Sequence, residues 1–198
     1  GVDYDGTRSS TSESSMNYSI QEIAHIIKAE YQHLTDSNIS VLLTDSRSLT
    51  FPEESLFFAL VTQRNDGHRY IFGLYKQGVR NFVVSHTSPE IQKLPDINLL
   101  FVPNTLQALQ QLAAFHRKKF DIPVVGISGS NGKTIVKEWL YQLLQTDYNV
   151  VRSPRSYNSQ IGVPLSVWQM NESTGLAIFE VSRKWARWIR LPPSYAPK

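Results

Sequence analysis

One stretch of the chain combines the residue types that bind nucleotide phosphates. Residues 126–134 read GISGSNGKT, which follows a run of β-branched residues and precedes a helical pattern. Glycines allow backbone N–H groups to turn towards phosphate oxygens, where a side chain would block the approach. Lys133 could reach the β- and γ-phosphates, and the hydroxyl of Thr134 is placed to coordinate Mg²⁺. The N-terminus of the helix that begins here adds partial positive charge.

The spacing of these glycines differs from the common phosphate-loop pattern. G-x-x-x-x-G-K-[ST] requires glycine at position 127, where this chain has isoleucine, and glycines at 126, 129 and 132 give G-x-x-G-x-x-G-K-T. The alternative interpretation is a glycine-rich turn that merely connects a strand to a helix. The Lys-Thr pair and the strand–loop–helix order favour a nucleotide phosphate site.

A second candidate for phosphate chemistry is Glu180, which ends the short apolar run 176–179. A carboxylate at the carboxyl end of a strand beside a phosphate loop lies where a magnesium ligand is found. A solvent-facing glutamate at a strand end is an equally good interpretation from the sequence.

The elements that would position these residues predict a parallel α/β arrangement over residues 119–182. Strands are expected over 122–127, 148–152 and 176–179, and helices over 133–145 and 164–170. This order is typical of a parallel sheet whose strands carry ligands at their carboxyl ends. We expect the first half of a P-loop ATPase domain.

Residues 16–118 predict a separate α/β domain. A capping-box pattern at Ser19 and Glu22 begins a helix expected over 19–31. Further helices are expected over 66–77 and 104–119, with strands over 39–44, 56–60, 79–85 and 99–102. Residues 1–15 are small and polar, which is typical of an appended, disordered leader before Met16.

The composition excludes several classes of protein. With 41% hydrophobic and 19% charged residues, the 198-residue chain is neither disordered nor collagen-like. Its net charge of +3 is dispersed, so we expect no nucleic-acid partner. The absence of cysteine excludes disulfides and thiol chemistry and is typical of a cytoplasmic protein. No run of 18 apolar residues predicts membrane insertion, and the five histidines lack metal-binding spacing.

Several spaced motifs resemble the Mur ligases of peptidoglycan synthesis. Residues 126–138, GISGSNGKTIVKE, are similar to the ATP loop of this family, and Lys137-Glu138 resembles its members that add D-alanyl-D-alanine. Residues 158–164, NSQIGVP, resemble the family's N-N-x-I-G-V-P. Motifs similar to the family's uridine-diphosphate-binding domain are TDSR at 44–47, LFFAL at 56–60, NDGH at 65–68 and GV at 78–79. The resemblance covers about residues 17–182, and 183–198 form an atypical tail.

The resemblance implies an ATP-dependent ligase that adds D-alanyl-D-alanine to UDP-N-acetylmuramoyl-tripeptide through an acyl phosphate, with ATP and Mg²⁺ as cofactors. It implies that Lys133 is catalytic and that Thr134 and Glu180 hold magnesium. The implied ATP-binding residues are Gly129, Ser130, Asn131, Gly132, Lys133 and Thr134. The implied contacts of the UDP-linked substrate are Ser46, Arg47, Thr62, Gln63, Arg64 and Asn158.

Other interpretations of the same residues remain open. The chain could resemble a Mur ligase that adds a diamino acid, or it could be an unrelated P-loop kinase or hydrolase. Such a kinase would have no reason to carry residues 44–47 and 66–68. Asp45 and Arg47 could also form only a local ion pair that fixes a turn. Because the family's amine-binding third domain is missing, we expect this chain to bind substrate without turnover.

Overall fold

The computed structural model describes residues 17–128, 132–153 and 159–181. Within these ranges no helix is long and apolar enough to cross a membrane. The helices are α1 (Ile20–Ile26), α2 (Ile71–Lys76), α3 (Pro89–Gln92), α4 (Thr105–Arg117), α5 (Lys133–Leu144) and α6 (Ser159–Trp168), with 3₁₀ turns η1 (Ser46–Ser48), η2 (Pro52–Glu54) and η3 (Gly67–Tyr70). The strands are β1 (Tyr18–Ser19), β2 (Asn38–Ile39), β3 (Val41–Leu43), β4 (Ser55–Phe58), β5 (Asn81–Val84), β6 (Asn98–Phe101), β7 (Val124–Ile127), β8 (Val150–Arg152) and β9 (Leu176–Glu180).

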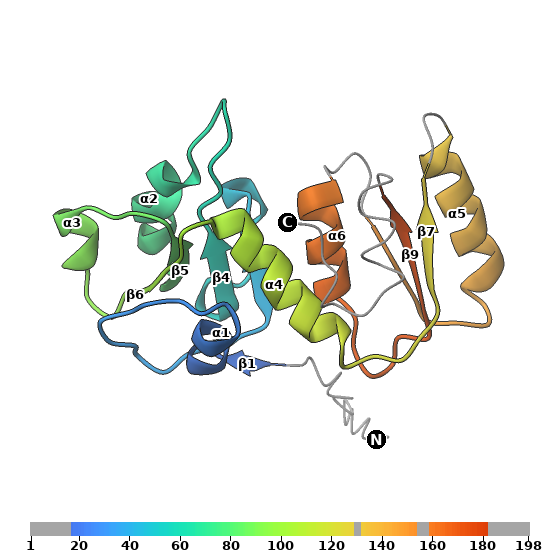
Figure 1. The fold of residues 1–198 in the computed structure, drawn as a ribbon, viewed down its shortest axis with the longest axis horizontal. Helices are drawn as coiled ribbons and strands as arrows, with labels where there is room; N and C mark the ends of the chain where they lie inside the picture. The colour runs from blue at the N-terminus through green and yellow to red at the C-terminus, as the bar shows by residue number, and fades with distance from the viewer. Residues whose placement is uncertain (1–16, 129–131, 154–158, 182–198) are drawn as a thin grey trace, which may run out of the picture.

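Two parallel sheets organise the chain, which confirms the predicted α/β class. The first has the order β3-β4-β5-β6, and the second has the order β7-β9-β8. A short antiparallel pair, β1 with β2, accompanies the first sheet. Figure 1 shows α4 and α6 side by side between the two sheets, with α5 on the far side of β7 and β9. Helix α5 therefore covers one face of the second sheet and α6 the other.

The first sheet follows from the short apolar runs in the sequence. All four residues of β4 are buried, as are all four of β5, which is typical of parallel strands covered on both faces. Because β3, β4, β5 and β6 are parallel and adjacent in sequence order, the loops that follow them lie along one edge of the sheet. The predicted strand over 39–44 is two strands, β2 and β3, which belong to different sheets.

Two predicted helices begin or end differently from the expectation. The helix expected over 19–31 has the predicted capping box at Ser19 but ends at Ile26, and Lys28 has a φ of 54°, in the left-handed region. The region 66–77 begins as η3, because the Asp66 side chain accepts a hydrogen bond from the His68 backbone N–H, and becomes α2 at Ile71. Asp66 thus acts as the N-cap of this turn.

Helix α6 begins five residues before the predicted start at Pro164. Proline is common in the first turn of a helix, which is why the helix was predicted to begin at Pro164. In the structure Pro164 lies inside α6. A proline inside a helix cannot donate to the carbonyl four residues earlier, which here is Gln160. The side chain of Gln110 in α4 donates to that carbonyl at 3.4 Å. A contact from the neighbouring helix thus replaces the hydrogen bond that proline removes.

The seam between α4 and α6 joins the two sheets through buried polar contacts. His116 in α4 is 1% exposed, and its Nε2 lies 2.7 Å from the Met170 carbonyl oxygen. A carbonyl can only accept, so Nε2 carries the proton and Nδ1 accepts the Tyr18 hydroxyl at 2.8 Å. Trp168 packs in the same core as Tyr18 and donates from its indole nitrogen to the Ser40 carbonyl at 2.9 Å. The predicted domain boundary near residue 118 stays a prediction, since this packing runs across it.

Candidate functional site

The strand–turn–helix arrangement predicted for the phosphate loop is present in the described residues that flank it. β7 ends at Ile127, and α5 begins at Lys133 after Gly132. Gly132 has a φ of 78°, and this left-handed conformation explains why the position immediately before the helix carries glycine. Lys133 and Thr134 are half-buried in the first turn of α5. Gly129, Ser130 and Asn131 lie outside the described residues.

Sheet register brings Glu180 to the same edge as the phosphate loop. Ile127, the last residue of β7, pairs with Glu180, the last residue of β9, and the Val181 N–H donates to the Ile127 carbonyl at 2.9 Å. The Glu180 backbone N–H donates to the Ser153 hydroxyl oxygen at 2.9 Å. The carboxylate is largely covered, with 18% of the side chain exposed. The interpretation of Glu180 as a solvent-facing strand end is therefore wrong.

The sequence alone did not reveal that Lys137 is the buried partner of Glu180. The Lys137 side chain is 0% exposed, and its ammonium lies 3.0 Å from Glu180 Oε1. The same nitrogen donates to the Ser153 carbonyl at 2.7 Å. Glu138 is 3.9 Å away and is itself paired with Arg152. One signal was available, because residues four apart lie on one helix face and Lys137 follows Lys133 by four.

The donors at this edge fit a magnesium ion by their chemistry. Glu180 Oε1 is a buried carboxylate oxygen, and within the described residues its ion pair with Lys137 is not aligned as a hydrogen bond. A carboxylate and a hydroxyl are hard oxygen donors, which suit Mg²⁺ better than softer metals. Glu180 and Thr134 would hold such an ion, and the ion would neutralise phosphate charge.

A different edge carries the residues predicted to bind the UDP-linked substrate. Ser46 and Arg47 lie in η1, directly after β3. The Asp45 side chain accepts from the Arg47 backbone N–H at 3.0 Å and pairs with the Arg47 guanidinium at 3.0 and 2.8 Å. These hydrogen bonds from Arg47 lower the pKa of Asp45. The local ion pair considered from the sequence exists, and the Arg47 side chain is nevertheless 88% exposed.

Thr62, Gln63 and Arg64 form an exposed loop after β4, the neighbour of β3. The loop is closed by Thr62, whose backbone N–H donates to the Asn65 carbonyl at 2.8 Å and whose hydroxyl accepts from the Asn65 N–H at 3.1 Å. The loops after β3 and β4 lie along the same sheet edge because the strands are parallel neighbours. Asn158, the remaining predicted contact, lies outside the described residues.

Three residues that could bind a metal lie close together beside this edge, but they form hydrogen bonds with one another and with the backbone. Asp66, His68 and His86 place donor atoms within 4.8 Å of one another. His68 Nε2 accepts the Ser85 N–H at 3.0 Å, so Nδ1 carries the proton and donates to Asp66 at 2.6 Å. The pKa of His68 is lowered, chiefly by burial, although Asp66 acts in the opposite direction. With both ring nitrogens engaged and the ring neutral, His68 has no lone pair to offer a metal.

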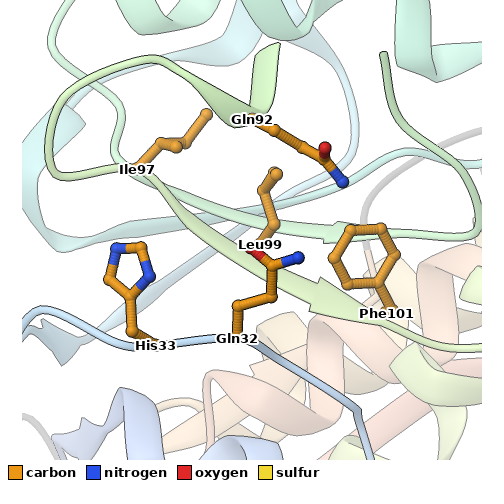
Figure 2. A pocket seen from close by; sticks show the side chains of 6 residues that line it. All are labelled: Gln32, His33, Gln92, Ile97, Leu99 and Phe101. Carbon is orange, nitrogen blue, oxygen red and sulfur yellow. The ribbon is translucent and has the colours of Figure 1, made fainter. Parts of the chain in front are cut away.

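A small hollow elsewhere on the first sheet contains none of the predicted site residues. Figure 2 shows its lining of Gln32, His33, Gln92, Ile97, Leu99 and Phe101. Its cavity volume is only about 20 Å³, and it opens to solvent beside β6. Because β6 and β3 are opposite ends of the strand order, this hollow is separate from the loops after β3 and β4.

Comparison with known proteins identifies the family. A model of the Mur ligase middle domain matches residues 127–191. The chain is 32% identical over 166 residues to UDP-N-acetylmuramoyl-tripeptide–D-alanyl-D-alanine ligase from Bacillus subtilis, covering 82% of this chain and 35% of the relative. It is 34% identical over 150 residues to the enzyme of that name from Synechocystis, covering 75% and 32%. The chain thus spans about a third of the length of these relatives.

Solved structures agree with this assignment. MurF from Acinetobacter baumannii has a TM-score of 0.75 at 24% identity, covering 85% of this chain and 36% of that one, which supports the fold. MurF ligase from Thermotoga maritima in complex with ADP has a TM-score of 0.60 at 25% identity, covering 73% and 32%. The sequence Gly132-Lys133-Thr134 at the start of α5 agrees with these similarities. Together they show that the chain belongs to the Mur ligase family and resembles its MurF members.

Proposed function

We propose that this chain carries the substrate-binding and nucleotide-binding segments of an ATP-dependent ligase that adds D-alanyl-D-alanine to UDP-N-acetylmuramoyl-tripeptide in the cytoplasm. The observation that carries the proposal is the edge where β7, β9 and α5 meet. There the positive-φ Gly132 precedes Lys133 and Thr134, and the β7–β9 register aligns Glu180 with the start of the loop. Two of the similar relatives, from Bacillus subtilis and Synechocystis, are named for this reaction.

The proposed ligation proceeds in two steps, the formation of an acyl phosphate and its attack by an amine. An oxygen of the tripeptide carboxylate attacks the γ-phosphorus of ATP, the bond to the β-γ bridging oxygen breaks, and ADP leaves. The D-alanyl-D-alanine amine then attacks the acyl carbonyl carbon, phosphate leaves, and the amine loses a proton. The first step brings two anions together, so its barrier is electrostatic. Lys133 would act there by neutralising phosphate charge, and Mg²⁺ would add to this effect.

The residues on the first sheet would anchor the other end of the substrate. Arg47 is highly exposed, and its guanidinium is oriented by Asp45. A guanidinium recognises a diphosphate through paired hydrogen bonds. Thr62, Gln63 and Arg64 on the neighbouring loop would contact the same uridine diphosphate, and Asn158 would lie near the junction with ATP.

Calorimetric titration of the chain with UDP-N-acetylmuramoyl-tripeptide tests the substrate site. If Arg47 contacts the diphosphate, Arg47→Ala weakens binding about 10- to 100-fold, which corresponds to the loss of a charge-assisted hydrogen bond. Asp45→Ala is the matched control, because it breaks the same ion pair but keeps the Arg47 guanidinium, so we expect a smaller loss of affinity. Equal losses in the two variants would instead support a pair that only fixes the turn. Preference for the UDP-linked dipeptide over the tripeptide would indicate a ligase that adds a diamino acid.

Titration with ADP and MgCl₂ tests the nucleotide site. We expect Lys133→Ala to weaken binding, again about 10- to 100-fold, because a cation on the phosphates is lost. Lys93→Ala removes an exposed lysine after α3 and should bind ADP as the wild type does. Because the chain spans about a third of its relatives, we expect binding without ligation. Formation of the ligated product by this chain would contradict that expectation.

A further inference from the structure

A buried lysine in α5 stands out because the proposed reaction does not use it. Lys137 is 0% exposed, although lysine is almost never fully buried without a partner. Its ammonium contacts Glu180 at 3.0 Å and donates to the Ser153 carbonyl at 2.7 Å. Ser153 directly follows β8 and Glu180 is the last residue of the neighbouring strand β9, so the lysine side chain reaches from α5 to the carboxyl end of the sheet.

Among the residues that the structure describes, the charged side chains in contact with Glu180 and Lys137 form pairs. Lys137 balances the carboxylate of Glu180 at 3.0 Å, whereas Glu138 is 3.9 Å from Lys137 and has its own partner in Arg152. Arg152 is further held by the Tyr141 ring, with its guanidinium carbon 3.6 Å from the ring centroid. A divalent cation arriving alone would therefore meet a carboxylate whose charge is already neutralised by an adjacent ammonium.

We propose that Lys137 is the counter-ion that prevents Glu180 from binding a divalent cation by itself, so that the cation binds only together with the nucleotide phosphates. With Lys137 in contact with Glu180, an ion at this carboxylate would need further negative charge from a ligand. The phosphates of ADP or ATP supply that charge at the loop after β7. Lys137 is thus a positioning residue that acts through Glu180. The inference rests on the nucleotide site proposed above.

The experiment measures Mn²⁺ binding to the full 198-residue chain, by electron paramagnetic resonance of the free ion, with and without ADP. We expect the wild type to bind Mn²⁺ with ADP and to bind at least about tenfold more weakly without it, because the pair with Lys137 is neutral. Lys137→Met should gain Mn²⁺ binding in the absence of ADP. Lys137→Arg keeps the positive charge and should behave as the wild type does.

The outcomes separate this inference from the proposed function. Tight Mn²⁺ binding by the wild type without ADP would overturn the role of Lys137, and this measurement holds even where Lys137→Met does not fold. An unchanged Mn²⁺ affinity in a folded Lys137→Met chain would overturn it as well. The gained binding must disappear in Lys137→Met/Glu180→Gln, since it depends on the freed carboxylate; its persistence would refute the proposal. Failure of the wild type to bind Mn²⁺ even with ADP would instead contradict the nucleotide site.

Discussion

Replacing His116 with phenylalanine tests whether the seam between α4 and α6 depends on its two buried hydrogen bonds. The phenylalanine ring can keep the aromatic contacts with Phe120 and Trp168, whose centroids lie 5.0 and 4.9 Å from the imidazole. It removes both ring nitrogens, so the Tyr18 hydroxyl and the Met170 carbonyl each lose a partner. A buried polar group left without a partner costs about 1–3 kcal/mol. With two such groups, we expect the free energy of unfolding to fall by about 2–6 kcal/mol.

Urea unfolding at pH 7.5, followed by far-ultraviolet circular dichroism, measures this loss. His33→Phe is the matched control, because His33 is exposed and should change the free energy of unfolding by less than about 0.5 kcal/mol. Combining His116→Phe with Tyr18→Phe forms a double-mutant cycle, and we expect a coupling of about 1 kcal/mol from the shared hydrogen bond. If His116→Phe costs no more than His33→Phe, the seam is held by apolar packing and our reasoning is refuted.

Four further measurements test the seam and other parts of the structure. Burial lowers the pKa of His116 below its ordinary value of 6.5, so the unfolded chain takes up the proton first and stability should decrease as the pH falls below about 6.5, which urea midpoints across pH 5–8 would show. Gly67→Ala should lower stability by about 1–3 kcal/mol, because the added Cβ would lie 2.8 Å from the Leu60 backbone nitrogen. Gly73→Ala in α2 meets no atom within 4 Å and should raise the thermal midpoint; a lower midpoint would contradict this. Trp168→Phe should cost about 1 kcal/mol through the lost indole hydrogen bond, and no change in its urea midpoint would show that this bond contributes nothing.

The sequence predicted the fold well where local signals and burial agreed. The apolar run 56–60 overlaps the buried strand β4, and Asn104 caps α4 by accepting from the Gln107 N–H at 3.0 Å. The predicted end of α1 was wrong, because the apolar spacing continues to Tyr31. Lys28 adopts a left-handed conformation, and the sequence has no glycine there to indicate it. Periodicity reports which side chains are buried and carries little information about such single-residue turns.

Only the part of the candidate site that lies in one continuous segment could be predicted from the sequence. Gly132, Lys133 and Thr134 are consecutive, so the pattern of the phosphate loop was readable from one segment. The burial of Lys137 was not, because its partners Ser153 and Glu180 are far away in sequence and meet it through the β8–β9 pairing. A lysine in an amphipathic helix is ordinarily exposed, and long-range contacts overrode that preference.

The seam between α4 and α6 has a consequence for how the chain unfolds. Trp168, from the second half of the chain, packs in one core with Tyr18 and α1 from the first half. Separating the two sheets would therefore uncover apolar surface in the first core as well as the polar groups that His116 satisfies. We therefore expect the two sheets to unfold as one cooperative unit, in which a change that destabilises one sheet also destabilises the other. On the same reasoning, we expect residues 118–122 to connect two packed elements without acting as a hinge.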